Sequence, residues 1–223
     1  MQAAKAKGGS NMTGNIRVFT QSSIRIEGSC GVIYLDPLHI PEEFHDAAFI
    51  LITHNHGDHF SEEDIKKAAA PDTVLIVPEK MKDQANALAS FVGSIETVKP
   101  GEQYRFGELE FETVAAYNNI KPFHPKKSGW VGYVLNVDGK RIYAAGDTDV
   151  VKENQAVRCD IAMVPIGGTF TMDAKKAAEL VNTIGPEIAI PIHYGTIVGK
   201  PADAKTFASL VKPEIKVEII IEK

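Results

Sequence analysis

The sequence has few cysteines, no excess of positive charge and no long apolar run. Its two cysteines, Cys30 and Cys159, lie far apart and show neither metal-ligand nor redox spacing, so a small buried thiol is the simpler interpretation of Cys159. The net charge of −5 argues against a nucleic-acid-binding surface, which is usually basic. No apolar run approaches the roughly 18 residues of a membrane span, and the start does not resemble a signal peptide. We therefore expect a cytoplasmic protein with no membrane partner.

The length predicts one domain preceded by a short tail. With 223 residues, the chain can build one substantial core but not two full-sized domains and a linker. Residues 1–11, "MQAAKAKGGSN", are small, basic and flexible in character, which is typical of an appended tag or a disordered tail. The domain is expected over residues 12–223.

Short β-rich runs alternate with helical patterns from residue 15 onward. Helices are predicted at residues 61–70, 79–93, 172–185 and 201–211, with Ser61 and Asp173 as N-caps and Gly185 as a stop. Asp138-Gly139 between apolar runs predicts a hairpin over residues 130–146. Further strands are predicted at residues 15–19, 22–28, 31–37, 48–53, 73–78, 160–165, 187–192 and 215–221, with two or three more in residues 95–117. This order predicts an α/β fold of four layers, αββα, in which two sheets pack together and helices cover their outer faces.

Four of the predicted strands end in a side chain that can bind a metal or move a proton. They end in Asp36, His54, Asp147 and His193. One such residue after a strand is more often a turn residue or a cap than a ligand. Because ligands of α/β sheets collect at the carboxyl ends of strands, four together predict one shared site.

The second of these strands runs into a cluster of histidines in "FILITHNHGDHF", residues 49–60. His54 and His56 can face one point, and Asp58 and His59 a neighbouring one. Neutral imidazole and carboxylate are ligands of Zn(II), Fe(II) and Mn(II), and the absence of thiolate excludes a structural Cys-type zinc site. The spacing is not that of the helical H-E-x-x-H motif. Gly57 is expected to allow a tight bend in the loop.

Together these motifs resemble the metallo-β-lactamase superfamily. "THNHGDH" matches its His-x-His-x-Asp-His signature, "YLDP" its early aspartate, and "AAGDTD" and "PIHYGT" its later aspartate and histidine motifs. "VPIGGTFTMDAKKAAEL" followed by "IPIHYGT" is similar to the small UlaG-like and UPF0173-type metal-dependent hydrolases. The resemblance covers residues 16–223 and implies the same αββα fold.

The resemblance also implies two divalent metal ions, zinc first, with manganese or iron as alternatives. The implied ligands are His54 and His56 for the first metal, and Asp58, His59 and His193 for the second. Asp147 would bridge both metals, and Asp36 would orient the histidine loop through hydrogen bonds. Two metals would lower the pKa of a bridging water and polarise the bond under attack. Asp58 and Asp147 are therefore the expected catalytic residues.

One departure from the family pattern concerns the third histidine of the first metal. Close UlaG-like relatives carry it in a stretch resembling "AYH" or "AFH", whereas this chain has Asn118 there and His124 six residues later. Asn is a poor ligand beside imidazole. Either the loop brings His124 into the site, which we favour, or the first metal is weakly held.

Three further residues are expected near the substrate. Lys126 would suit an anionic group, although a solvated loop lysine is an equal alternative. Thr169 belongs to "GGTFTM", which either offers donors to an anion at a helix start or is only a tight turn. Tyr194 follows His193 and would donate a hydrogen bond in the site.

The leading hypothesis is a hydrolase that uses metal-activated water on a small anionic ester, lactone or phosphodiester. A nuclease is less favoured, because the chain has no room for the inserted domain of nucleic-acid-processing relatives. A non-catalytic metal-binding or regulatory module is the alternative from another class, and its support is Asn118. A redox di-iron enzyme is a third and weaker alternative, because Asn55-His56 does not match the His-x-Glu-x-Asp pattern of di-iron members of the superfamily.

Overall fold

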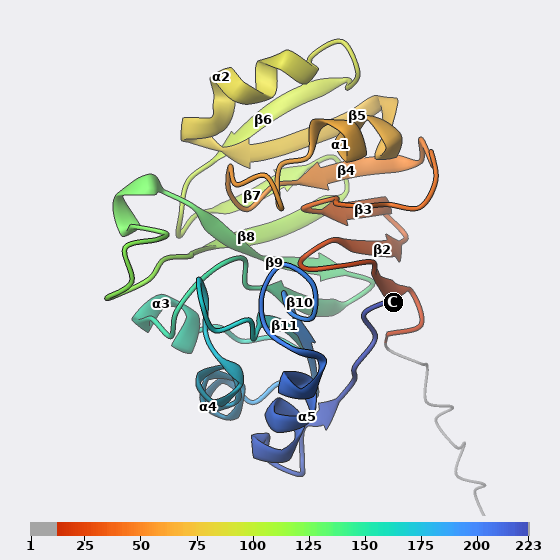
Figure 1. The fold of residues 1–223 in the computed structure, drawn as a ribbon. Coiled ribbons are helices and arrows are strands. Elements are labelled where there is room, and N and C mark those ends of the chain that lie inside the picture. Colours follow the sequence, from red (N-terminus) through yellow and green to blue (C-terminus); the bar gives the residue numbers. More distant parts are fainter. Residues whose placement is uncertain (1–12, 223) are drawn as a thin grey trace, which may run out of the picture.

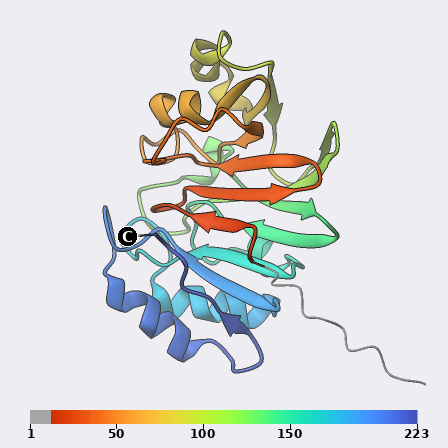
Figure 2. The same ribbon diagram turned by 90° about the vertical axis from the view of Figure 1, so that its right-hand side faces the viewer.

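Two β-sheets lie face to face and carry helices on their outer sides (Figure 1). This computed structural model describes residues 13–222, so the expected tail at residues 1–11 lies outside the described residues. In the turned view of Figure 2, the yellow and orange helices lie above the red strands, and the blue helices lie below the second sheet. The predicted four-layer αββα fold in one domain is confirmed.

The first sheet has six strands in the order of the sequence. Its first three strands pair antiparallel and the remaining ones parallel. Their bounds are β1 (Ile16–Val18), β2 (Ile24–Gly28), β3 (Gly31–Leu35), β4 (Ala47–Leu51), β5 (Ala69–Pro78) and β6 (Ser94–Val98).

The second sheet has seven strands and the reverse spatial order, β13-β12-β11-β10-β9-β8-β7. It too begins antiparallel, from β7 to β10, and continues parallel from β10 to β13. Its bounds are β7 (Gln103–Phe106), β8 (Leu109–Ala115), β9 (Val131–Val137), β10 (Lys140–Ala144), β11 (Ile161–Pro165), β12 (Ile188–Ile192) and β13 (Lys216–Val217). In both sheets, therefore, the parallel half delivers loops to one end.

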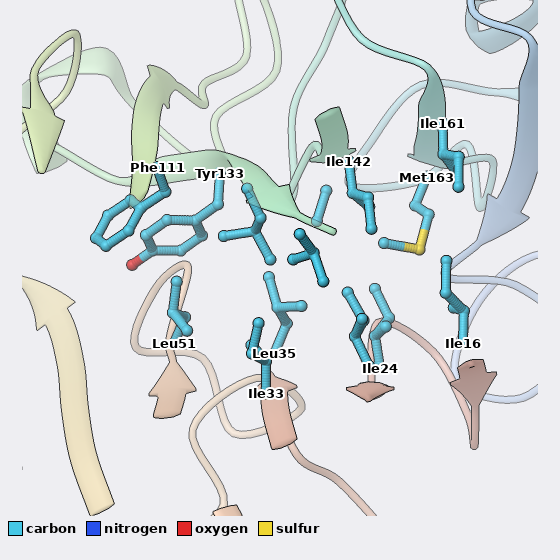
Figure 3. Close-up of a cluster of buried hydrophobic side chains, with 14 of the residues drawn as sticks. Ile16, Ile24, Ile33, Leu35, Leu51, Phe111, Tyr133, Ile142, Ile161 and Met163 are labelled. Atoms are coloured by element: carbon cyan, nitrogen blue, oxygen red, sulfur yellow. The ribbon is translucent and has the colours of Figure 1, made fainter. Parts of the chain in front are cut away.

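The core between the sheets consists of the side chains that alternate inward from both (Figure 3). Ile33, Leu35 and Leu51 of the first sheet meet Phe111 and Tyr133 of the second. Burial of such side chains stabilises the fold by about 1.5–3 kcal/mol each. This core fixes the distance between the two sheets and hence between the loops at their ends.

The helices form the two outer layers. Those over the first sheet are α1 (Glu62–Ala68) and α2 (Lys82–Ala85), the latter between the 3₁₀ turns η1 (Glu79–Met81) and η2 (Asn86–Leu88). Those associated with the second sheet are α3 (Lys152–Gln155), α4 (Ala174–Ile184) and α5 (Pro201–Leu210). None of the helices within residues 13–222 combines the length and apolar character needed to cross a bilayer.

Local sequence signals account for most of the element boundaries. Ser61 Oγ accepts from the Asp64 amide at the start of α1, and Asp173 caps α4 in the same way. Gly185 ends α4 in the left-handed conformation, with φ +63°. Asp138 and Gly139 both have positive φ, as a two-residue hairpin turn requires.

Two predicted elements were wrong in extent. The helix expected at residues 79–93 is broken into η1, α2 and η2, because the chain must turn back at Gly93, whose amide donates to Thr73 O at 2.8 Å. The strand expected at residues 215–221 is reduced to β13, because the following segment leaves the second sheet. Ile221 instead bridges to Val18 at the edge of the first sheet. The sequence prediction also missed α3.

Candidate metal centre

Five histidines and two aspartates meet at one end of the core, four of them from the loop after β4 and one from each of three other loops. The loop after β4 carries His54, His56, Asp58 and His59. The other side chains follow β8, β10 and β12: His124, Asp147 and His193. Apart from the half-buried His56 and Asp58, all of these residues are buried.

The carboxylate of Asp147 stands between two groups of ligands. Its Oδ2 lies 3.3 Å from His124 Nε2 and 4.0 Å from His54 Nε2. Its Oδ1 lies 3.3 Å from Nε2 of both His59 and His193. Each oxygen of one carboxylate therefore faces a different set of imidazoles, which is the arrangement a bridging ligand needs.

The first group contains His54, His56 and His124, with one ligand atom of each within 4.8 Å of the others. His54 Nε2 and His56 Nδ1 face each other at 3.1 Å. Of the two candidates in the loop after β8, the structure brings His124 into this group. Asn118 is not part of the group: its Nδ2 donates to Phe123 O at 3.0 Å and Phe170 O at 2.7 Å, and lies 3.3 Å from His124 Nδ1.

The second group contains Asp58, His59 and His193. Asp58 Oδ2 lies 3.3 Å from His193 Nε2 and 3.7 Å from His59 Nε2. All the ligand residues expected from the sequence are thus brought together, in the two expected sets.

Asp36 and Thr53 fix one histidine ring in each group through contacts with its Nδ1. Asp36 Oδ2 lies 2.6 Å from His59 Nδ1, and Thr53 donates to both oxygens of Asp36, at 2.8 Å from N and 2.6 Å from Oγ1. Thr53 Oγ1 is also 2.9 Å from His54 Nδ1. Both histidines therefore have Nδ1 engaged by an oxygen, which directs Nε2 into the cluster. Asp36 lies where the sequence placed it, and Thr53 was missed; its one signal is a polar residue at the end of a buried apolar run.

Burial and charge act against each other on the ionisable groups. Burial would raise the pKa of Asp147, but His193 and His59 outweigh it and hold that pKa well below its usual value. Burial would lower the pKa of His59, but Asp147 and Asp36 outweigh it and raise that pKa well above its usual value. Burial, with His59 next to it, lowers the pKa of His54. Asp147 is therefore held as a carboxylate at the centre of the cluster, while His54 is held neutral.

Several buried ligand atoms lack a hydrogen-bond partner among the described residues: His59 Nε2, His124 Nε2 and Asp147 Oδ1. Leaving such atoms unpaired costs about 1–3 kcal/mol each. Imidazole nitrogens and carboxylate oxygens are the ligands of borderline divalent metals. The residues present therefore fit divalent metal ions, which would satisfy all of these atoms.

Three site residues adopt the left-handed backbone conformation that favours glycine. Asp36, His124 and His193 have φ values of +44°, +56° and +56°. Such conformations cost of order 1–3 kcal/mol and persist where the surroundings enforce them, commonly at functional sites. Local strain at three strand or loop ends accordingly turns these side chains into the cluster.

The three residues expected near the substrate are not among those that line the hollow beside the cluster. Lys126 is exposed and its Nζ binds Glu153 at 2.8 Å. Thr169 is exposed in a tight turn, and Tyr194 is buried in the apolar cluster beneath α4 and α5. Gly57 has no positive φ, and a Cβ there would meet nothing within 4 Å, so the loop does not require glycine at this position.

Comparison with known proteins places this cluster in a family. A family model described as the beta-lactamase superfamily domain matches residues 15–193. The chain belongs to this superfamily. Within it, a UPF0173 metal-dependent hydrolase of Pyrococcus abyssi is 35% identical over 192 residues, which cover 81% of each chain. The chain is thus a member of the UPF0173 metal-dependent hydrolases.

Solved structures support the same fold. A protein of Parabacteroides distasonis with the provisional name metal-dependent hydrolase matches with a TM-score of 0.78 and 28% identity, over 93% of each chain. A provisionally named zinc-dependent hydrolase of the metallo-beta-lactamase superfamily from Thermotoga maritima matches with a TM-score of 0.59 and 18% identity, over 93% of this chain and 98% of that one.

Proposed function

We propose that this chain is a hydrolase that holds two divalent metal ions, zinc first, and cleaves an ester-type bond of a small molecule with water. The observation that carries the proposal is the position of Asp147, each of whose oxygens faces a separate ligand group. His54, His56 and His124 would hold one ion, and Asp58, His59 and His193 the other. When bound, such ions lower the pKa of a bound water and polarise the bond under attack.

The chain's own residues supply position and proton acceptance. Asp58 is half-buried and lines the hollow above the cluster, so its carboxylate can orient water there and accept its proton. Asp36 and Thr53 fix the rings of His59 and His54, which keeps Nε2 directed inward. Ligands held in fixed positions favour the reaction more than mobile ligands do, because they do not have to reorganise during it.

The substrate is proposed to be a carboxylic ester, a lactone or a phosphodiester. All three present a carbon or phosphorus atom to attack by water. The hollow over the cluster measures about 280 Å³, which is at the small end of ligand sites and favours a small molecule over a nucleic acid.

The test uses protein reloaded with zinc or manganese after chelation and a panel of nitrophenyl esters, lactones and phosphodiesters. We expect turnover that chelation removes and reloading restores. Asp58→Asn should lower kcat at least about a hundredfold, and Asp72→Asn, an exposed carboxylate elsewhere, should not. A metal-binding module without catalysis would instead bind metal and turn over nothing in the panel.

A further inference from the structure

Apolar side chains make up part of the lining of the hollow above the candidate metal centre. Four ligand residues line it, among them His56 and Asp58, and the other lining residues are Phe123, Phe170 and Ile197. We name these last three side chains the apolar rim. They come from three separate loops, after β8, β11 and β12.

Packing does not explain the exposure of the rim. Phe123 and Ile197 are 43% and 57% exposed, although large apolar side chains are favoured inside. Single exposed apolar residues are ordinary, but apolar side chains that gather at one concave site mark a binding surface. Here they gather over the only described groups able to hold two metals close together.

One buried amide holds two of the three rim residues in place. Asn118 Nδ2 donates to the main-chain oxygens of Phe123 and Phe170, which ties two of the three loops together. The two phenyl rings meet edge-to-face, with centroids 4.8 Å apart and planes at 88°. The Asn118 amide N also donates to His124 O at 2.8 Å, so the rim and a ligand loop form one unit.

Two lysines of the loop that carries Phe123 are already paired. Lys121 Nζ contacts Asp149 Oδ1 at 3.1 Å and also donates to Thr171 O. Lys126 Nζ binds Glu153. Among the described residues that line the hollow there is no lysine or arginine. Beyond the metal site itself, the described lining of the hollow therefore offers an incoming anion no lysine or arginine.

We propose that the rim selects the uncharged apolar arm of the substrate, so that the ester or lactone cleaved carries a short alkyl or acyl chain. This inference rests on the proposed hydrolytic function and revises the anionic substrate expected from the sequence. Phe123 and Ile197 are specificity-determining residues in this account, and Asn118 is a positioning residue. Transfer of each methylene from water to the rim improves kcat/KM by at most about fourfold.

The experiment compares nitrophenyl acetate, butyrate and hexanoate on the metal-loaded protein. We expect kcat/KM to rise with chain length, and Phe123→Ser and Ile197→Ser to lower the ratio of hexanoate to acetate kcat/KM. Phe91→Ser and Leu210→Ser are matched controls, since these side chains are each 45% exposed on the helical layers. The inference would be overturned if kcat/KM of the unmodified protein did not rise with chain length, or if it rose equally in the unmodified protein and in both rim variants.

A negatively charged substrate gives a second test of the inference. Nitrophenyl hemisuccinate, with the same acyl length as butyrate, should be at least about tenfold poorer, and Ile197→Lys should narrow that gap. If the unmodified protein preferred hemisuccinate or a phosphodiester, the proposed role of the apolar rim would be overturned. The proposed hydrolase function would still stand.

Failure to cleave any ester, lactone or phosphodiester would instead overturn the proposed function. The rim remains testable then, because the single tryptophan, Trp130, lies 5.0 Å from the His56 ring. Titration with 2-heptanone should change Trp130 fluorescence saturably in the unmodified protein and not in Phe123→Ser. Equal responses from both proteins would contradict the rim.

Discussion

Asp36 Oδ2 lies 2.6 Å from His59 Nδ1, and both side chains are buried. The contact joins the end of β3 to the loop after β4, so it sets the ring of a ligand from a neighbouring strand. Asp36 itself needs a left-handed backbone to make it.

Asp36→Asn should weaken metal binding while the fold is kept. The amide replaces the carboxylate that contacts His59 Nδ1, so apparent metal affinity should fall about 10–100-fold. Competition with a chromophoric chelator measures this, with Asp72→Asn as the exposed control. Unchanged affinity in Asp36→Asn would show that His59 needs no support.

Thr53→Val tests the hydroxyl of Thr53, because valine keeps the shape of the side chain and removes the hydroxyl. Valine leaves Asp36 and His54 without the Oγ1 contact, which should cost about 1–3 kcal/mol of stability and lower metal affinity. Thr53→Ser keeps the hydroxyl and should resemble the unmodified protein in metal affinity. Urea unfolding and chelator competition report the two effects, and equal affinities for valine and serine would contradict the assignment.

Gly132→Ala should destabilise the second sheet. A Cβ there would lie 2.5 Å from Ala145 O and 2.7 Å from Ala144 O, so β9 and β10 must separate. We expect a loss of at least about 1–3 kcal/mol in urea unfolding. Gly57→Ala is the control and should be neutral, because nothing lies within 4 Å of its added methyl group. Similar losses at both positions would contradict this account.

Cys159 should make stability fall at alkaline pH. Burial raises the pKa of its thiol from 9.0 to about 12, so the folded chain keeps a proton that the unfolded chain releases earlier. The contribution is complete below about pH 9 and is lost as pH rises toward about 12. The difference in unfolding free energy between the unmodified protein and Cys159→Ala should therefore shrink over this range. A difference independent of pH would show that the thiol is solvated.

The sequence contains most of the fold because its local signals agree with its global pattern. The Asp138-Gly139 turn, the caps at Ser61 and Asp173, and the alternation of strands each specify an element that the sheets also need. The prediction of one helix at residues 79–93 was wrong because the chain has to turn back toward β6, and this overrides the helical spacing of the sequence. Such tertiary constraints are invisible in a local window.

The candidate site was predictable where it depends on strand ends and less so where it depends on loops. His54, Asp147 and His193 follow buried strands, so their meeting follows from topology. The choice between Asn118 and His124 depends on the path of an irregular loop, which no periodicity encodes. The pairing of Lys126 with Glu153 likewise depends on α3, an element that the sequence prediction missed.

If one carboxylate, that of Asp147, joins two complete ligand groups, the chain should bind two metal ions, and the metal content per chain tests this most directly. Elemental analysis of protein reloaded with zinc and freed of excess ion should give about two ions per chain. His124→Ala should reduce this to about one, and His39→Asn, an exposed histidine with φ +50°, should leave it unchanged. One ion or fewer in the unmodified protein would contradict the account.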